Sequence, residues 1–187
     1  MKTISIIFQT YYLVVCVIFC IILGNVGNAY SQQVLKDYAG HALLVSAHSF
    51  VPIFGDEEKN SIINYVMNDT IKEEYVLIAI HEIKGKMAEV DITSPLDNTF
   101  KEISGWIETK NLGIHVSCYD TDTVKVLQTP KLNSKVSFLI VKPQWKDFYI
   151  IYDAYQGWLY IQNINNEQEY GWLSVKYQCD NPYTTCN

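Results

Sequence analysis

Apolar and polar residues alternate along most of the chain after residue 40, and short polar clusters interrupt the alternation. A period of two in segments rich in β-branched and aromatic residues is typical of β-strands with one buried face. The interruptions, such as Pro95-Leu96-Asp97-Asn98, carry residues that favour turns. The pattern predicts strands over 42–46, 75–83, 87–92, 124–127, 136–141, 148–152, 158–161 and 171–175.

One segment, 57–67, follows a different pattern. Its apolar residues Ile62, Ile63, Val66 and Met67 stand at helical spacing, which predicts a helix, although a strand over 61–66 is the alternative. No other stretch of ten or more residues keeps a period of 3.6. The chain is therefore predicted to be all-β.

A tryptophan motif occurs twice. Gly105-Trp106-Ile107 returns as Gly171-Trp172-Leu173, 66 positions later. Upstream of each copy lies a matching run, 86–90 and 157–161, preceded by an extended piece with a proline, 51–54 and 127–130. Two copies of a unit of about 60–70 residues are too few for a solenoid and suit two tandem small barrels. We expect their joint near 114–122.

The run 157–161 indicates how such a unit is built. Alternation places Leu159 and Ile161 on one face of a strand and Trp158 and Tyr160 on the other. The matching run of the first unit has Glu89 in the place of Tyr160. Because a carboxylate is rarely buried without a partner, this second face is expected to point outward.

These motifs together resemble the bacterial Src-homology-3-like (SH3b) domain. The second unit, about 122–178, carries more of the pattern, whereas the first, about 42–113, keeps Gly105-Trp106-Ile107 and has Met87 where the second has Trp158. In each copy a glycine before the tryptophan lets another strand or ring approach closely. The resemblance implies two tandem small SH3-like β-barrels, a divergent one at 30–115 and a second at 116–178, followed by a tail at 179–187.

The N-terminus has the features of a secretory signal peptide. Met1-Lys2 provides a positive start, the apolar run 11–23 has the length of a signal core, and small residues lead to Ala29. This run is shorter than the ~20 residues that span a bilayer. We therefore predict cleavage after Ala29 and a secreted or periplasmic protein of the bacterial envelope without a stable membrane anchor. An uncleaved anchor is the alternative.

Five cysteines are present, and two of them, Cys16 and Cys20, lie in the predicted signal peptide. For the others, an oxidising compartment favours a disulfide between Cys179 and Cys186 that pins the C-terminal tail. Closing so short a loop contributes about 2.5 kcal/mol in the chain-entropy model. Pairing of Cys179 with Cys118 is the alternative.

The charge of the chain argues against nucleic acid as a partner. All 14 basic residues are lysines, and 20 acids give a net charge of −6. Proteins that bind nucleic acids need clustered cations, and Arg is their usual base reader. The charge is uneven, since residues 30–115 carry −6 and residues 116–187 carry −1.

Candidates for catalysis are few. A cysteine peptidase of the NlpC type, which is often joined to SH3b domains, needs a histidine downstream of its nucleophile. Cys118 follows His115, so this order is wrong, and no G-x-S-x-G hydrolase motif is present. His41, His48, His81 and His115 fit no tight metal spacing, and we read His81-Glu82 as structural. We expect no enzyme activity, metal or cofactor.

Aromatic residues provide the main indication of function. Residues 116–187 contain thirteen, more than a barrel of about 60 residues can bury, so several should be exposed or lie between the barrels. Exposed Tyr and Trp line peptide and sugar grooves. We expect ligand binding by Trp145, Tyr152, Tyr155, Trp158 and Tyr160, with a cell-wall peptide, a glycan or an envelope protein as the partner. A cell-wall hydrolase, and a structural subunit or inhibitor of an envelope enzyme, are the alternatives.

Overall fold

The computed structural model describes residues 38–45, 49–69, 75–117, 121–144 and 147–180, so the predicted signal peptide, Cys118, Trp145 and Cys186 lie outside the described residues. Within these ranges the chain is all-β, as predicted, and its helical elements are two single 3-10 turns, η1 (Thr109–Asn111) and η2 (Val175–Tyr177). The strands are β1 (Gly40–Leu44), β2 (Val51–Phe54), β3 (Ile62–Val66), β4 (Leu77–Lys84), β5 (Met87–Thr93), β6 (Ile103–Glu108), β7 (Leu112–Val116), β8 (Thr123–Leu127), β9 (Val136–Val141), β10 (Phe148–Tyr155), β11 (Trp158–Asn163), β12 (Asn166–Leu173) and β13 (Gln178–Cys179).

The helix predicted over 57–67 is wrong, and the strand alternative is correct. β3 occupies the second part of this segment and pairs with β2. Ile62, Ile63 and Tyr65 of β3 are exposed, so the helical spacing of apolar residues did not mark a buried helix face. β-branched Ile and Val suit the extended backbone, and pairing with β2 decides the conformation.

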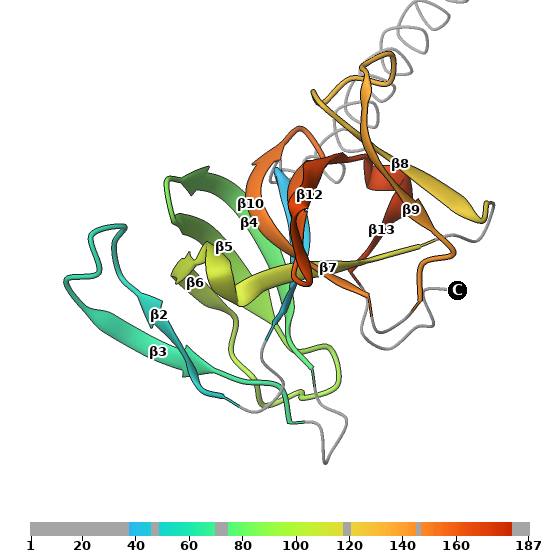
Figure 1. The fold of residues 1–187 in the computed structure, drawn as a ribbon. Coiled ribbons are helices and arrows are strands. Elements are labelled where there is room, and N and C mark those ends of the chain that lie inside the picture. The colour runs from blue at the N-terminus through green and yellow to red at the C-terminus, as the bar shows by residue number, and fades with distance from the viewer. Residues whose placement is uncertain (1–37, 46–48, 70–74, 118–120, 145–146, 181–187) are drawn as a thin grey trace, which may run out of the picture. The chain divides into compact units, whose positions relative to one another are not determined.

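All the strands belong to one antiparallel sheet of 13 strands. Its order is β3-β2-β6-β5-β4-β1-β7-β10-β11-β12-β8-β9, and β13 pairs with β7. The β2–β3 and β8–β9 hairpins lie at the two ends of this order and at opposite sides of Figure 1. The two closed SH3-like barrels expected from the sequence remain a prediction.

The pairings follow the same scheme twice, and we call β1 to β7 the first repeat and β7 to β13 the second repeat. β1 pairs with β4 and β7, just as β7 pairs with β10 and β13. β4, β5 and β6 form a meander like that of β10, β11 and β12. β7 thus closes the first repeat and opens the second, and the predicted boundary between residues 115 and 116 falls within this strand.

The registers of the two meanders match residue by residue. A two-residue turn sets Lys84 opposite Met87 in the first repeat and Tyr155 opposite Trp158 in the second. Met87 and Trp158 therefore hold equivalent positions, as the sequence comparison predicted. One residue is inserted as a bulge in each first strand: His81 in β4 and Tyr152 in β10. The later loops differ, since β5 and β6 are joined by residues 94–102 and β11 and β12 by residues 164–165.

The glycines of the tryptophan motifs allow a neighbouring strand to cross closely. A Cβ at Gly105 would lie 2.8 Å from the carbonyl oxygen of Phe54, and one at Gly171 would lie 2.7 Å from that of Leu127. The predicted close approach is confirmed. Phe54 pairs with Trp106 and Leu127 with Trp172, so β2 is equivalent to 124–127 rather than to the proline-bearing 127–130. Matching the two prolines gave the wrong sequence alignment of the repeats. In the second repeat the strand that approaches Gly171 is β8, which ends before Pro130.

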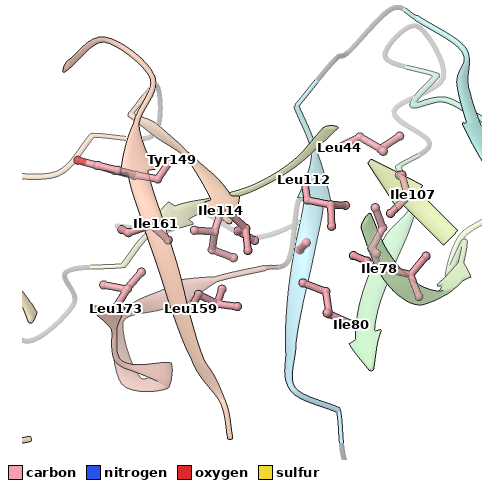
Figure 2. Packing of buried hydrophobic residues seen from close by; sticks show 14 of the residues in the cluster. Leu44, Ile78, Ile80, Ile107, Leu112, Ile114, Tyr149, Leu159, Ile161 and Leu173 are labelled. Carbon is pink, nitrogen blue, oxygen red and sulfur yellow. The ribbon is translucent and has the colours of Figure 1, made fainter. Parts of the chain in front are cut away.

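The buried core is one cluster that includes side chains of both repeats and of β7, which they share. Figure 2 shows Leu112 of β7 with Leu44 and Ile107, while Ile114, two residues later, lies with Ile161 and the second repeat. All five side chains are buried. Burying one such side chain fully stabilises the fold by about 1.5–3 kcal/mol. Both repeats consequently depend on the same strand.

Candidate functional site

An open groove lies on the outer face of the second meander and has a volume of about 270 Å³. It is lined by Tyr152, Tyr160, Gln162 and Tyr170. Strand alternation explains why these side chains are there, because Leu159 and Ile161 of β11 are fully buried. The residues between and after them, Tyr160 and Gln162, must then point outward.

The neighbouring strands supply the other two tyrosines. In β12, Tyr170 pairs with Gln162 and Trp172 pairs with Tyr160. In β10, the bulge at Tyr152 interrupts the alternation after the buried Ile151, so Tyr152 turns to the outer face. Three strands and one bulge therefore bring the tyrosines to one place.

The rings at the groove contact one another. The Tyr160 ring lies 6.1 Å from that of Tyr170 and 5.4 Å from that of Trp172, measured between centroids, and is tilted by 48° and 62° respectively. Such tilted and edge-to-face pairs are favoured by the ring quadrupoles. Burial, and secondarily the neighbouring Tyr170, raises the pKa of the Tyr160 phenol. At physiological pH the Tyr160 hydroxyl is neutral, as an unperturbed phenol also is, and can donate a hydrogen bond.

Two of the five binding residues expected from the sequence, Tyr152 and Tyr160, line the groove. Tyr155 and Trp158 face each other at the turn between β10 and β11 and are not among its lining residues. Trp145 lies outside the described residues. The expected exposure of several aromatic residues is confirmed, because Tyr152, Tyr155 and Tyr170 are exposed in the described part of 116–187.

Sequence reasoning missed Gln162 and Tyr170. Tyr170 directly precedes the second Gly171-Trp172 motif, so two-residue alternation from Trp172 could have placed it on the outer face. Gln162 continues the alternation of Trp158 and Tyr160. Their proximity, however, follows from the register between β11 and β12, which the chain does not reveal locally.

The first repeat has a polar cluster at the equivalent positions. His81 is the bulge residue that corresponds to Tyr152, and Asp91 pairs with Ser104 as Gln162 pairs with Tyr170. The Asp91 carboxylate lies 2.9 Å from Nε2 of His81 and accepts a 2.6 Å hydrogen bond from Oγ of Ser104. We call these three residues the aspartate clasp.

The geometry of the aspartate clasp does not activate a nucleophile. In a Ser-His-Asp triad the serine hydroxyl donates to the histidine, which then takes its proton. Here the Ser104 hydroxyl donates to Asp91 instead. Asp91 is nearly fully buried, and His81 is covered by the Tyr38 ring at 5.1 Å between centroids. The clasp therefore ties β4, β5 and β6 together, in agreement with the structural role predicted for His81.

The other described histidines have separate partners. His41 lies 3.4 Å from the Asp180 carboxylate. Nδ1 of His115 lies 3.0 Å from the carbonyl oxygen of Asp147. Among the described residues no group of three or more His, Cys, Asp or Glu could hold a metal ion. His48 lies outside them.

Cys179 is buried and disulfide-bonded. It ends β13 opposite His115 of β7. Its two predicted partners, Cys186 and the alternative Cys118, are outside the described residues, so the identity of the pair stays a prediction.

The strands that form the groove carry acidic charge only. From Phe148 to Leu173 the chain has Asp153, Glu167 and Glu169 and no lysine. The part-buried Glu169 side chain accepts a 2.7 Å hydrogen bond from the Asn163 amide. An anionic ligand would therefore gain no attraction at this face, whereas a neutral ligand can stack on the tyrosine rings.

Comparisons with known proteins leave the family of this chain open. No family model matches the chain, and no match is found among curated proteins. A solved structure that does match is NlpC1 from Trichomonas vaginalis, at 9% sequence identity and a TM-score of 0.30. The match covers 74% of this chain and 45% of the NlpC1 chain, so this chain spans less than half the length of that structure.

In the part of the chain that the structure describes, no helix has the length and apolar character needed to cross a membrane.

Proposed function

We propose that this chain is an exported, non-catalytic binding protein of the bacterial cell envelope, built from two tandem SH3-like barrels. Its ligand is an uncharged segment of glycan or peptide in the cell wall. The binding site is the groove formed by Tyr152, Tyr160, Gln162 and Tyr170. The observation that carries the proposal is the gathering of three tyrosines around one open groove.

The chemistry of the groove supports a neutral, partly flat ligand. Tyrosine rings offer a large apolar surface at little cost in conformational entropy, and each hydroxyl can exchange hydrogen bonds with sugar hydroxyls or peptide groups. The Tyr160 ring is already held by Tyr170 and Trp172, so little further ordering is needed on binding. The volume of about 270 Å³ suits one sugar ring or one to two side chains rather than a large cofactor.

The duplicated fold supports a specialised second repeat. Equivalent positions hold the aspartate clasp in one repeat and the tyrosine groove in the other. The part-buried polar contacts of the clasp hold strands together, whereas the rings of the open groove leave surface for a partner. We infer that the first repeat supports the fold and that the second repeat binds the ligand.

The proposal is tested by binding to purified peptidoglycan and to its soluble glycan and stem-peptide fragments. We expect wild-type protein to sediment with peptidoglycan and to bind at least one fragment by calorimetry. Tyr160→Ala removes a ring on which the ligand is proposed to stack, and we expect this loss to cost about 1.4 kcal/mol or more. Binding should then weaken about tenfold or more. Tyr155→Ala provides the matched control, because this half-exposed tyrosine of β10 does not line the groove.

Three outcomes contradict the proposal. Equal binding by wild type and a folded Tyr160→Ala variant would remove the groove from the site. Absence of binding to every cell-wall material, with a stable protein partner recovered instead, would exclude the proposed ligand. Release of soluble fragments from peptidoglycan by the wild-type protein would show that it is an enzyme.

A further inference from the structure

The two strands at the ends of the sheet have exposed apolar side chains. β3 presents Ile63 and Tyr65, each 53% exposed, and β9 presents Leu139 and Val141, which are 51% and 62% exposed. The outer edge of each strand has no neighbour in the sheet order of the described residues. Within the part of the chain that the structure describes, both edges are therefore open to pairing with a further strand.

Neither strand has the protection that usually prevents such pairing. Natural edge strands tend to carry charges, especially Lys, or a proline. β3 reads Ile-Ile-Asn-Tyr-Val and β9 reads Val-Ser-Phe-Leu-Ile-Val, without a charge or a proline in either. Strands of five and six residues also match each other in length. This combination is typical of an edge that pairs with another chain.

The charges of the two edge hairpins are opposite. Residues 51–69, the β2–β3 hairpin with the three residues that follow it, contain four acids and one lysine, a net charge of −3. Residues 123–142, the β8–β9 hairpin with the one residue that follows it, contain four lysines and no acid, a net charge of +4. The hairpins hold equivalent places in the two repeats. The β2–β3 hairpin pairs with β6 and the β8–β9 hairpin pairs with β12, and β6 and β12 are the tryptophan strands, which carry the Gly-Trp motif of each repeat. Equivalent structures with opposite charge are complementary partners.

We propose that β3 of one copy of this chain pairs with β9 of a second copy. The two hairpins lie at opposite ends of the sheet, so they are not placed to meet within one chain (Figure 1). Pairing β3 with β3 would bring −3 against −3, and pairing β9 with β9 would bring +4 against +4. Charge thus selects the β3–β9 combination, which continues the sheet from one copy to the next.

An antiparallel pair of this kind also aligns the flanking charges. It would set the acidic turn of Asp56 and Glu57, before β3, near Lys142 after β9. It would also set Asp69, after β3, near Lys135 before β9. Because each copy keeps one β3 edge and one β9 edge, the association is head to tail and does not close at a dimer.

Sedimentation velocity on protein produced from the full chain tests this inference. We expect the mean mass to rise with concentration beyond that of a dimer. Between about 50 mM and about 500 mM salt the association should weaken, because the charges at the hairpins are exposed and screened. This experiment is independent of the tyrosine groove, so it does not depend on the proposed ligand.

Two charge variants identify the edges. Tyr65→Lys places a cation on β3 that the basic hairpin repels, and Leu139→Glu places an anion on β9 that the acidic hairpin repels. Each variant alone should be monomeric at concentrations where the wild type associates. Mixed together, they should associate again, because β9 of the first variant and β3 of the second are both intact. Val175→Lys and Leu96→Glu make the same types of change at exposed sites away from both edges and should associate like the wild type.

The mixing result distinguishes the proposal from other modes of association. A monomeric wild type at every concentration and salt would overturn it. Association that survives in one single variant would show an edge pairing with its own kind. Variants that remain monomeric when mixed, while circular dichroism shows both to be folded, would also exclude β3–β9 pairing.

Discussion

Gly171 lies so close to Leu127 that a Cβ at position 171 would come within 2.7 Å of the Leu127 carbonyl oxygen. Gly105 has the same relation to Phe54 in the first repeat, at 2.8 Å. Each glycine lets an edge hairpin cross the tryptophan strand of its repeat. The attachment of each hairpin to the sheet therefore depends on the absence of a side chain at the glycine that it crosses.

Replacing this glycine should destabilise the protein strongly. Gly171 has a φ of +154°, which L residues rarely adopt, so Gly171→Ala adds backbone strain to the clash with Leu127. We expect a loss of about 2–4 kcal/mol in the free energy of unfolding, measured with urea. Gly85→Ala is the control, because Gly85 has a φ of +60° but no atom within 4 Å of the added Cβ, and it should cost about 1–2 kcal/mol. Equal losses would contradict the close approach.

The aspartate clasp should contribute more to stability than its counterpart in the second repeat. Asp91→Ala removes a nearly buried carboxylate from the part-buried His81 and the exposed Ser104, and we expect a loss of about 1–3 kcal/mol. Gln162→Ala, at the equivalent and more exposed position, should cost less than about 1 kcal/mol. Chemical denaturation of both variants provides the comparison. A smaller loss for Asp91→Ala than for Gln162→Ala would show that the clasp is not structural.

Tyr149 should make stability fall at high pH. Burial, and then the carboxylates of Asp147 and Glu169, raises the pKa of the Tyr149 phenol above its ordinary value. The unfolded chain ionises first, above a pH of about 10, and binds fewer protons than the folded chain. The contribution of Tyr149 is therefore complete below this pH and falls at higher pH, by up to about 1.4 kcal/mol per pH unit.

The comparison of wild type with Tyr149→Phe measures this effect. The free energy of unfolding should decline less steeply for the variant between about pH 9 and pH 11, where the unfolded phenol ionises. The variant lacks only the ionisable hydroxyl, so the apolar packing of the ring is retained. Curves that remain parallel throughout the range would rule out a contribution of Tyr149 ionisation.

The partner of Cys179 can be identified by peptide mapping without reduction. We predict a linked peptide that contains Cys179 and Cys186, as inferred from the predicted export of the protein and the short intervening segment. Reduction should then lower the free energy of unfolding by about 2.5 kcal/mol. A peptide that joins Cys179 to Cys118 would instead support the alternative pairing.

Local patterns were sufficient to predict much of the fold. The alternation of Leu159 and Ile161 with Trp158 and Tyr160 is confirmed by burial, because a strand that packs on one side exposes every second side chain. The two tryptophan motifs also predicted the internal duplication and the close approach at their glycines. The segment 57–67 was misread because its apolar residues fit both helix and strand, and only pairing with β2 distinguishes them.

By itself, the sequence determined the all-β class, the duplicated unit and which face of β11 points outward. Tertiary structure decided that Tyr152, Gln162 and Tyr170 meet at one groove, that Asp91 joins His81 and Ser104, and that both repeats share β7. The physical reason is the separation along the chain of the residues that interact. Alternation is a property of neighbouring residues, whereas bulges and strand register arise from contacts between residues far apart in the chain.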